Sequence, residues 1–223
     1  MGRHLVRVVL ALTPLLPAVG ASAAHAQVGL AVRASTLGIG GELSFRAARN
    51  LGIRLGGNYL QFSRDATVEQ IDYRITPHLE NGTAILDFHP FGGSFHLSGG
   101  LLLNYNEGRM VATLNSNIEI GDSTYTPQQV GSLNGSVSFK KTAPYLGLGF
   151  AGRSRVAVLF DLGVGFTGRP VVELIGQTNL TGNAKSAFDS NVAKEQQEAQ
   201  VEIDGHKVLR YHPVVSFGLK VSF

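Results

Sequence analysis

One histidine and one serine stand two residues apart, in a spacing that could support acyl-transfer chemistry. His96 and Ser98 are followed by Gly99 and Gly100, and a histidine beside a serine hydroxyl can act as base and nucleophile. Both residues fall on the same polar side of an alternating segment, shortly after a tight turn. These features fit a histidine that only forms hydrogen bonds with its polar neighbours better than they fit a catalytic base. We therefore expect no catalytic role for the pair.

The other histidines form no recognisable metal site. The spacings among His78, His89, His206 and His212 match no zinc-ligand pattern. The glycine-rich run at residues 38–41 lacks the context of a phosphate-binding loop, and it more simply permits close packing within a strand. We expect neither a metal nor another cofactor.

Charged residues are few, and several recur on the polar faces of alternating segments. They make up 16% of the 223 residues, whereas an ordinary soluble domain has about 25%. Those on the polar faces have both signs, so inside a closed structure they would neutralise one another. Arg33 lies on one such face. We expect an interior charge network that contains Glu42, Arg46, Arg54, Asp87, Asp161 and Lys220.

The elements that carry these residues alternate apolar and polar side chains, which is the pattern of half-buried β-strands. The end of the chain is the clearest case. From Tyr211 to Phe223 the odd positions are mostly large and apolar, whereas the even positions are mostly small or polar. Similar faces recur along the chain and predict eight strands, at residues 28–35, 37–48, 51–63, 71–89, 94–106, 140–152, 155–169 and 208–223.

The fourth predicted strand changes phase along its length. Tyr73 and Ile75 occupy odd positions, whereas Leu86 occupies an even one. A β-bulge near Asn81-Gly82 would return both sets to one face. Asn-Gly also favours a hairpin turn, so two shorter strands remain an alternative. We favour the bulge, because a single strand here lets the topology close.

Tight turns and long polar segments alternate between the predicted strands. Tight turns follow the second, fourth and sixth strands, whereas residues 107–139 and 170–207 are long and polar. Within the second long segment, residues 187–203 predict a short helix with Asp189 or Ser190 as its N-cap. Transmembrane β-barrels combine short periplasmic turns, long external loops and an even strand count. The expected fold is all-β: an eight-stranded antiparallel transmembrane β-barrel with short periplasmic turns and long extracellular loops.

A soluble eight-stranded barrel of the lipocalin type would show the same alternation. Its polar face would meet water, and water-exposed surfaces normally carry far more charge than these faces, which are rich in Gly, Ala, Ser and Asn. The apolar faces carry no charge. These features favour the membrane barrel.

The first 26 residues have the features of a cleaved secretory signal. Arg3 and Arg7 precede an apolar stretch, and Ala-His-Ala at residues 24–26 fits the small-x-small cleavage rule. The apolar stretch is shorter than the roughly 20 residues of a membrane-spanning helix. The mature chain, residues 27–223, then has 19 − 2 = 17 basic and 16 acidic side chains. This balance argues against binding to nucleic acid.

The last strand carries a resemblance to a known class of proteins. The segment that ends at Phe223 resembles the terminal strand by which bacterial outer-membrane barrels are recognised for assembly, and the matching residues are Tyr211, Phe217, Leu219, Val221 and Phe223. The mature chain resembles a small Gram-negative outer-membrane barrel of the OmpA-like and OmpW-like size class. The resemblance implies export to the bacterial outer membrane, contact with its lipids and recognition by the barrel-assembly machinery.

Members of that class are membrane staples, adhesins, narrow pores or lipid-modifying enzymes. We favour a structural or surface-interaction role in the cell envelope, with an extracellular partner bound through residues 107–139 and 170–207. A narrow pore for small molecules is the alternative. The His96 and Ser98 pair resembles in type the His-x-Ser pair of lipid A deacylases, which are also outer-membrane barrels. Lipid A lies in the leaflet opposite the short turns, so this activity is the least favoured.

Overall fold

The computed structural model describes residues 27–68 and 71–223, and the predicted signal peptide lies outside this part of the chain. The described residues form fourteen β-strands, one α-helix and the short 3-10 helix η1 (Lys207–Arg210). None of the helical segments in these two ranges is long and apolar enough to cross a membrane.

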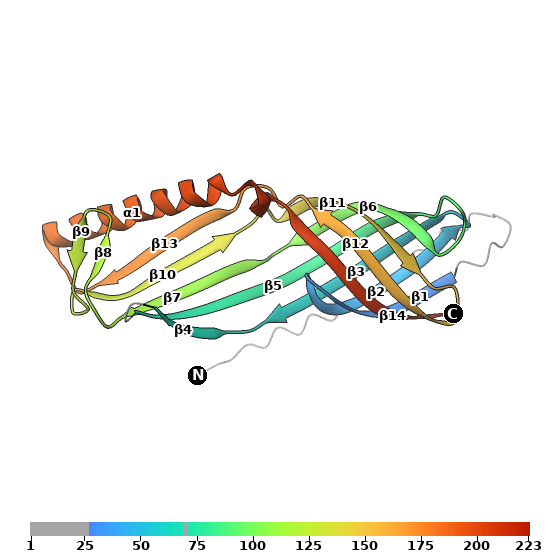
Figure 1. Ribbon diagram of the computed structural model, residues 1–223, viewed down its shortest axis with the longest axis horizontal. Coiled ribbons are helices and arrows are strands. Elements are labelled where there is room, and N and C mark those ends of the chain that lie inside the picture. Colours follow the sequence, from blue (N-terminus) through green and yellow to red (C-terminus); the bar gives the residue numbers. More distant parts are fainter. Residues whose placement is uncertain (1–26, 69–70) are drawn as a thin grey trace, which may run out of the picture.

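Eight strands form a closed cycle of antiparallel pairs (Figure 1). The pairing runs from β5 through β3, β2, β1, β14, β12, β11 and β6, and returns to β5. The last strand pairs with the first, with Val32 opposite Leu219, so this ring has no open edge. Its strands are β1 (Gln27–Ser35), β2 (Gly38–Ala48), β3 (Leu51–Gln61), β5 (Ile71–Phe88), β6 (Phe95–Asn104), β11 (Thr142–Ala151), β12 (Val156–Gly165) and β14 (His212–Ser222).

The total of fourteen strands differs from the predicted eight because the two segments expected to be loops are mostly regular structure and because residues 64–68 form a further strand. β7 (Glu107–Leu114), β10 (Val130–Ser138) and β13 (Val171–Thr178) extend the sheet outward from β5. β4 (Arg64–Val68) pairs with β5, and β8 (Ile118–Ile120) pairs with β9 (Ser123–Tyr125). These strands, the first half of β5 and the helix α1 (Gly182–Gly205) lie beyond one end of the ring (Figure 1). We call this part the platform: residues 64–68, 71–78, 107–138 and 171–205.

β5 belongs to both the ring and the platform. Its residues 81–88 pair with β6, and its residues 71–78 pair with β7. The hairpin alternative is therefore wrong. The predicted bulge is also wrong, because the pairing with β3 passes through Asn81 and Gly82 without a register shift. The change of phase has another cause: Tyr73 packs on the platform core, whereas Leu86 is exposed on the outer wall of the ring.

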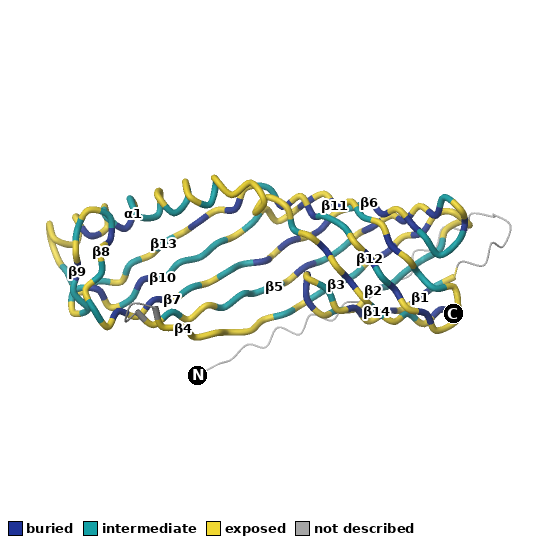
Figure 2. Tube along the Cα trace, viewed as in Figure 1, coloured by how far each residue is buried: buried dark blue, intermediate teal, exposed yellow. Residues whose placement is uncertain are grey.

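The outer wall of the ring carries large apolar side chains that are exposed, and buried and exposed residues recur along the ring strands (Figure 2). Exposed aromatic side chains gather near its two ends: Phe88, Phe91, Phe150 and Phe223 at the end with the short turns, and Tyr59, Tyr105, Phe166 and Tyr211 at the platform end. Twelve residues separate Tyr211 from Phe223, which in a strand tilted by about 45° is a height of about 28 Å. This height matches the hydrocarbon thickness of a bilayer, about 30 Å.

The platform has a hydrophobic core of its own. Phe188 and Val192 of α1 are buried there with side chains from β7, β8, β9 and β10. The helix begins at Gly182 and its N-cap is Thr181, so the predicted cap at Asp189 or Ser190 is wrong. Phe188, which lies inside the predicted helix, is fully buried.

Candidate functional site

Five charged side chains meet inside the ring because each occupies an inward position of a different strand. Arg33 and Arg54 lie among Glu42, Asp87 and Asp161, and all five side chains are at least nine-tenths buried. Arg54 Nε lies 2.6 Å from Asp87 Oδ2, its Nη2 3.1 Å from Asp161 Oδ1 and its Nη1 3.2 Å from Glu42 Oε2. Arg33 pairs with Asp161 and, at 2.7 Å, with Glu42. These five residues, the lumen network, connect strands on several sides of the ring.

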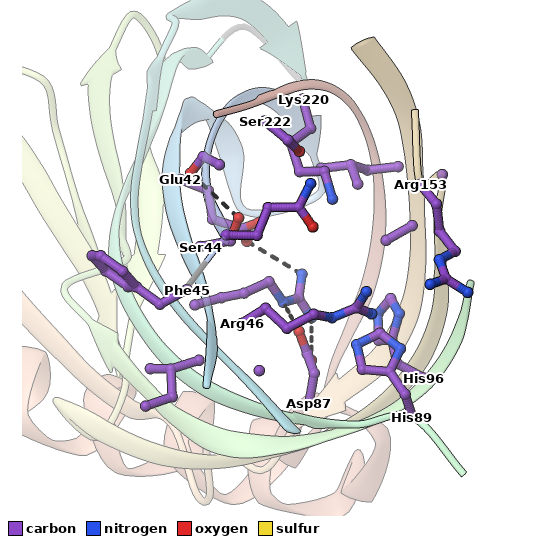
Figure 3. A pocket seen from close by; sticks show the side chains of 18 of the residues that line it. Glu42, Ser44, Phe45, Arg46, Asp87, His89, His96, Arg153, Lys220 and Ser222 are labelled. Atoms are coloured by element: carbon purple, nitrogen blue, oxygen red, sulfur yellow. Dashed lines mark hydrogen bonds and ion pairs between the residues drawn. The ribbon is translucent and has the colours of Figure 1, made fainter. Parts of the chain in front are cut away.

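The lumen network overlaps with the predicted set but is not identical to it. Glu42, Arg54, Asp87 and Asp161 were predicted, whereas Arg33 was recognised only as a residue of a polar face. Arg46 and Lys220 were also predicted, but no carboxylate among the described residues lies within ion-pair distance of either. They instead line a cavity of about 60 Å³ at the short-turn end of the lumen (Figure 3).

His96 and Ser98 both hydrogen-bond to the network. His96 Nε2 lies 2.9 Å from Asp161 Oδ1, and the Ser98 hydroxyl donates to Asp87 Oδ1 over 2.7 Å. Ser98 also accepts a hydrogen bond from Arg54. Its hydroxyl thus donates to a carboxylate and not to the histidine, so this structure lacks the hydrogen bond between nucleophile and base. The geometry matches the expectation of a buried histidine with polar neighbours.

An apolar layer fills the lumen on the platform side of the network. Its buried members come from both halves of the ring: Leu37, Ile85, Leu102, Ala143, Tyr145 and Val214. A second cavity of about 30 Å³ lies between this layer and the charges. An eight-stranded barrel has an interior just wide enough for side chains, and here charged and apolar side chains occupy successive levels.

The platform ends in a strand whose outer edge is covered by α1. The amide of Val172 donates to Gln200 Oε1 over 2.9 Å, and the amide of Leu174 donates to Gln196 Oε1 over 3.0 Å. Two glutamines four residues apart on a helix therefore reach two amides two residues apart on a strand. At the end of α1, hydrogen bonds from Arg169 lower the pKa of Asp204 below its usual value.

Sequence reasoning missed this edge. A pair of glutamines at helical spacing was the available signal, but glutamine is so common on exposed helix faces that the pair did not point to a strand.

The closed antiparallel ring, with its exposed apolar wall and polar interior, has the fold of small outer-membrane β-barrel proteins. CarO2 of Acinetobacter baumannii is similar, with a TM-score of 0.58 and 20% identity, over 89% of this chain and 99% of CarO2. CarO of the same organism is also similar, with a TM-score of 0.56 and 22% identity, over 88% of this chain and 97% of CarO. A major outer membrane protein from Thermus thermophilus is a more distant match, with a TM-score of 0.43 and 12% identity, over 89% of this chain and 100% of that chain.

No protein-family model matches the sequence, and no curated protein sequence matches it. The resemblance to small outer-membrane barrels expected from the sequence is confirmed for the fold.

Proposed function

We propose that the chain is exported by a cleaved signal peptide to the bacterial outer membrane, where it displays the platform at the cell surface in a structural or surface-interaction role. The exposed apolar wall and the two groups of aromatic side chains support the location. One observation carries the proposed role: the lumen is filled, whereas two long chain segments build a packed structure beyond the ring.

The filled lumen makes a narrow pore the second choice. A permeating ion would have to displace both the lumen network and the apolar layer, and the flanking cavities measure only about 60 and 30 Å³. We expect negligible conductance from the purified protein in a planar bilayer. Stable and reproducible single-channel steps would favour the pore instead.

The proposed partner surface is the platform, within residues 107–139 and 170–207. α1 places Val201 on its exposed side, while Phe188 and Val192 hold the opposite side against the sheet. The surface is therefore supported by a hydrophobic core and by the edge contacts of α1, so a partner would meet an ordered structure.

The proposed assembly signal lies on the outer wall, next to the strand pair that closes the ring. Phe217, Leu219 and Val221 are exposed along β14, and Tyr211 and Phe223 flank the strand. β14 pairs with β1 on one side and with β12 on the other. Recognition of this strand by the assembly machinery would precede the closure of the ring.

Single-cysteine labelling tests the proposed orientation, because the chain contains no native cysteine. We would compare Val201→Cys on the exposed side of α1 with Ser154→Cys in the exposed β11–β12 turn. A maleimide too large to cross the outer membrane should label V201C on intact cells and S154C only after permeabilisation. Labelling of S154C alone on intact cells would show the opposite orientation, and labelling of neither would contradict surface display.

A further inference from the structure

At the short-turn end of the lumen, positive side chains outnumber the acidic side chains among the described residues. Arg46 of β2, Lys220 of β14 and Arg153 of the β11–β12 turn line the same cavity (Figure 3). None of the three lies within ion-pair distance of a carboxylate in the described ranges. The three short turns at this end, residues 49–50, 89–94 and 152–155, contain three arginines and no Asp or Glu. The excess charge is therefore a property of this whole end of the ring.

The neighbouring lumen network neutralises these cations only in part. It contains two arginines and three carboxylates, a sum of −1, and its carboxylates already pair with its own arginines. The lumen network and the three cations that line the cavity together have a net charge of −1 + 3 = +2. Burial, and then the charge of Arg46, lowers the pKa of His89 beside the cavity, so this imidazole contributes no charge at neutral pH.

The cavity also contains a buried donor without an acceptor. Arg33 lines it, and the Nε atom of this residue is buried and has no hydrogen-bond partner in the described chain. Arg33 is only 8% exposed, and its guanidinium stays protonated at any physiological pH. A buried N–H without an acceptor is costly. Glu42 Oε1 lines the same cavity and is also buried without a hydrogen-bond partner in the described chain, so the indication of a missing anion rests on this Nε together with the three cations.

The volume of the cavity and the positions of its three cations restrict the size and shape of the anion. About 60 Å³ is room for about four water molecules, at 10–15 Å³ for each, and therefore for a small group. The three cations come from three different elements around the opening. A planar carboxylate suits the fork of one arginine, whereas a tetrahedral oxyanion presents oxygens in several directions and can accept from all three.

We propose that Arg46, Lys220 and Arg153, which line one half-buried cavity together with Arg33, form a binding site for a phosphate group; Arg153 also donates to Gly92 O over 3.1 Å. The headgroup of a phospholipid beside the ring and free inorganic phosphate present the same chemistry. The site lies at the end of the ring remote from the platform. It is thus a second binding function, separate from surface display.

Titration of the purified full-length mature protein with inorganic phosphate, in an uncharged, phosphate-free detergent, tests the site. Calorimetry should show binding that weakens with added NaCl. Each cation removed should weaken binding about tenfold, so the double variant Arg46→Gln, Lys220→Gln should lose about 100-fold. Arg155→Gln is the matched control, since Arg155 is exposed in the same turn region but does not line the cavity.

A second arm distinguishes the sources of the phosphate. Native mass spectrometry of protein taken from micelles that contain phosphatidylglycerol should show retained lipid in wild type and less in the double variant. Binding of phosphatidylglycerol without inorganic phosphate identifies a headgroup site, and the reverse identifies a site for the free ion. Either outcome supports the proposal.

Three outcomes would overturn it: neither probe binds, the double variant binds as well as wild type, or acetate binds as tightly as phosphate. Heat-dependent gel mobility establishes that each variant has a closed barrel. If the double variant does not fold, the single change Arg153→Gln, in an exposed turn, should still weaken binding about tenfold, and an unchanged affinity there also overturns the proposal.

Discussion

Replacing Arg54 by methionine should destabilise the ring far more than the same replacement of Arg46. Arg54 contacts three carboxylates and is 6% exposed, whereas Arg46 is half-buried and contacts none in the described chain. Without Arg54, Arg33 alone would pair with Glu42 and Asp161, and Asp87 would have no cationic partner in the lumen network. Removing one partner of a buried ion pair costs about 3–5 kcal/mol. With a urea slope of about 1–3 kcal/mol/M, the unfolding midpoint should fall by roughly 1–5 M.

The assay is urea unfolding of the protein refolded into lipid vesicles, followed by gel mobility without boiling. The chain has no tryptophan, so tyrosine fluorescence or circular dichroism would provide the second probe. Adding Asp87→Asn to Arg54→Met removes the unpaired charge, and this double variant should be more stable than Arg54→Met alone. Equal midpoints for Arg54→Met and Arg46→Met, or no recovery in the double variant, would refute the assignment of the stabilisation to the lumen network.

Three further tests concern the wall, the platform and the closing strand. Leu219→Arg on the exposed wall should cost about 2–4 kcal/mol by the same assay, whereas Val201→Arg on α1 should change stability by about 0.5 kcal/mol or less; similar effects would contradict a lipid-facing wall. Phe188→Ala should cost about 3–5 kcal/mol in the platform core, detected as protease sensitivity of α1 while the gel mobility of the closed ring is retained. Deleting Phe223 should leave the chain in the periplasm in cell fractionation, and normal insertion would contradict its role in assembly.

The alternation of side chains predicted the ring well because each ring strand separates an apolar wall from a narrow polar interior. Val156 to Phe160 is a clear case, with Ala157 and Leu159 turned inward and buried. The pairing of the last strand with the first also followed from the need to leave no open edge in a bilayer.

Depth along the barrel could not be predicted from alternation. Arg46 and Arg54 both turn inward. Arg54 lies at the level of Asp87 and Asp161, whereas Arg46 lines the cavity at the short-turn end of the lumen. Their levels depend on strand tilt and register, which a period of two residues does not encode.

The platform escaped prediction because its apolar residues face a protein core, whereas those of the ring face outward. Tyr73 and Leu86 therefore stand on opposite faces of one regular strand, and this looked like a bulge. The helix was expected at residues 187–203, whereas it spans Gly182–Gly205. Contacts between segments far apart in sequence place Tyr73 in the platform core and leave Leu86 on the outer wall.

The continuity of β5 also has a consequence for recognition. An unbroken strand of 18 residues, about 60 Å long, passes from the ring into the platform without a linker. A module on a flexible tether loses orientational freedom when it binds, and this loss weakens the complex. Here the orientation is already set during folding, so a partner at the cell surface would meet a binding face held at a constant angle to the membrane.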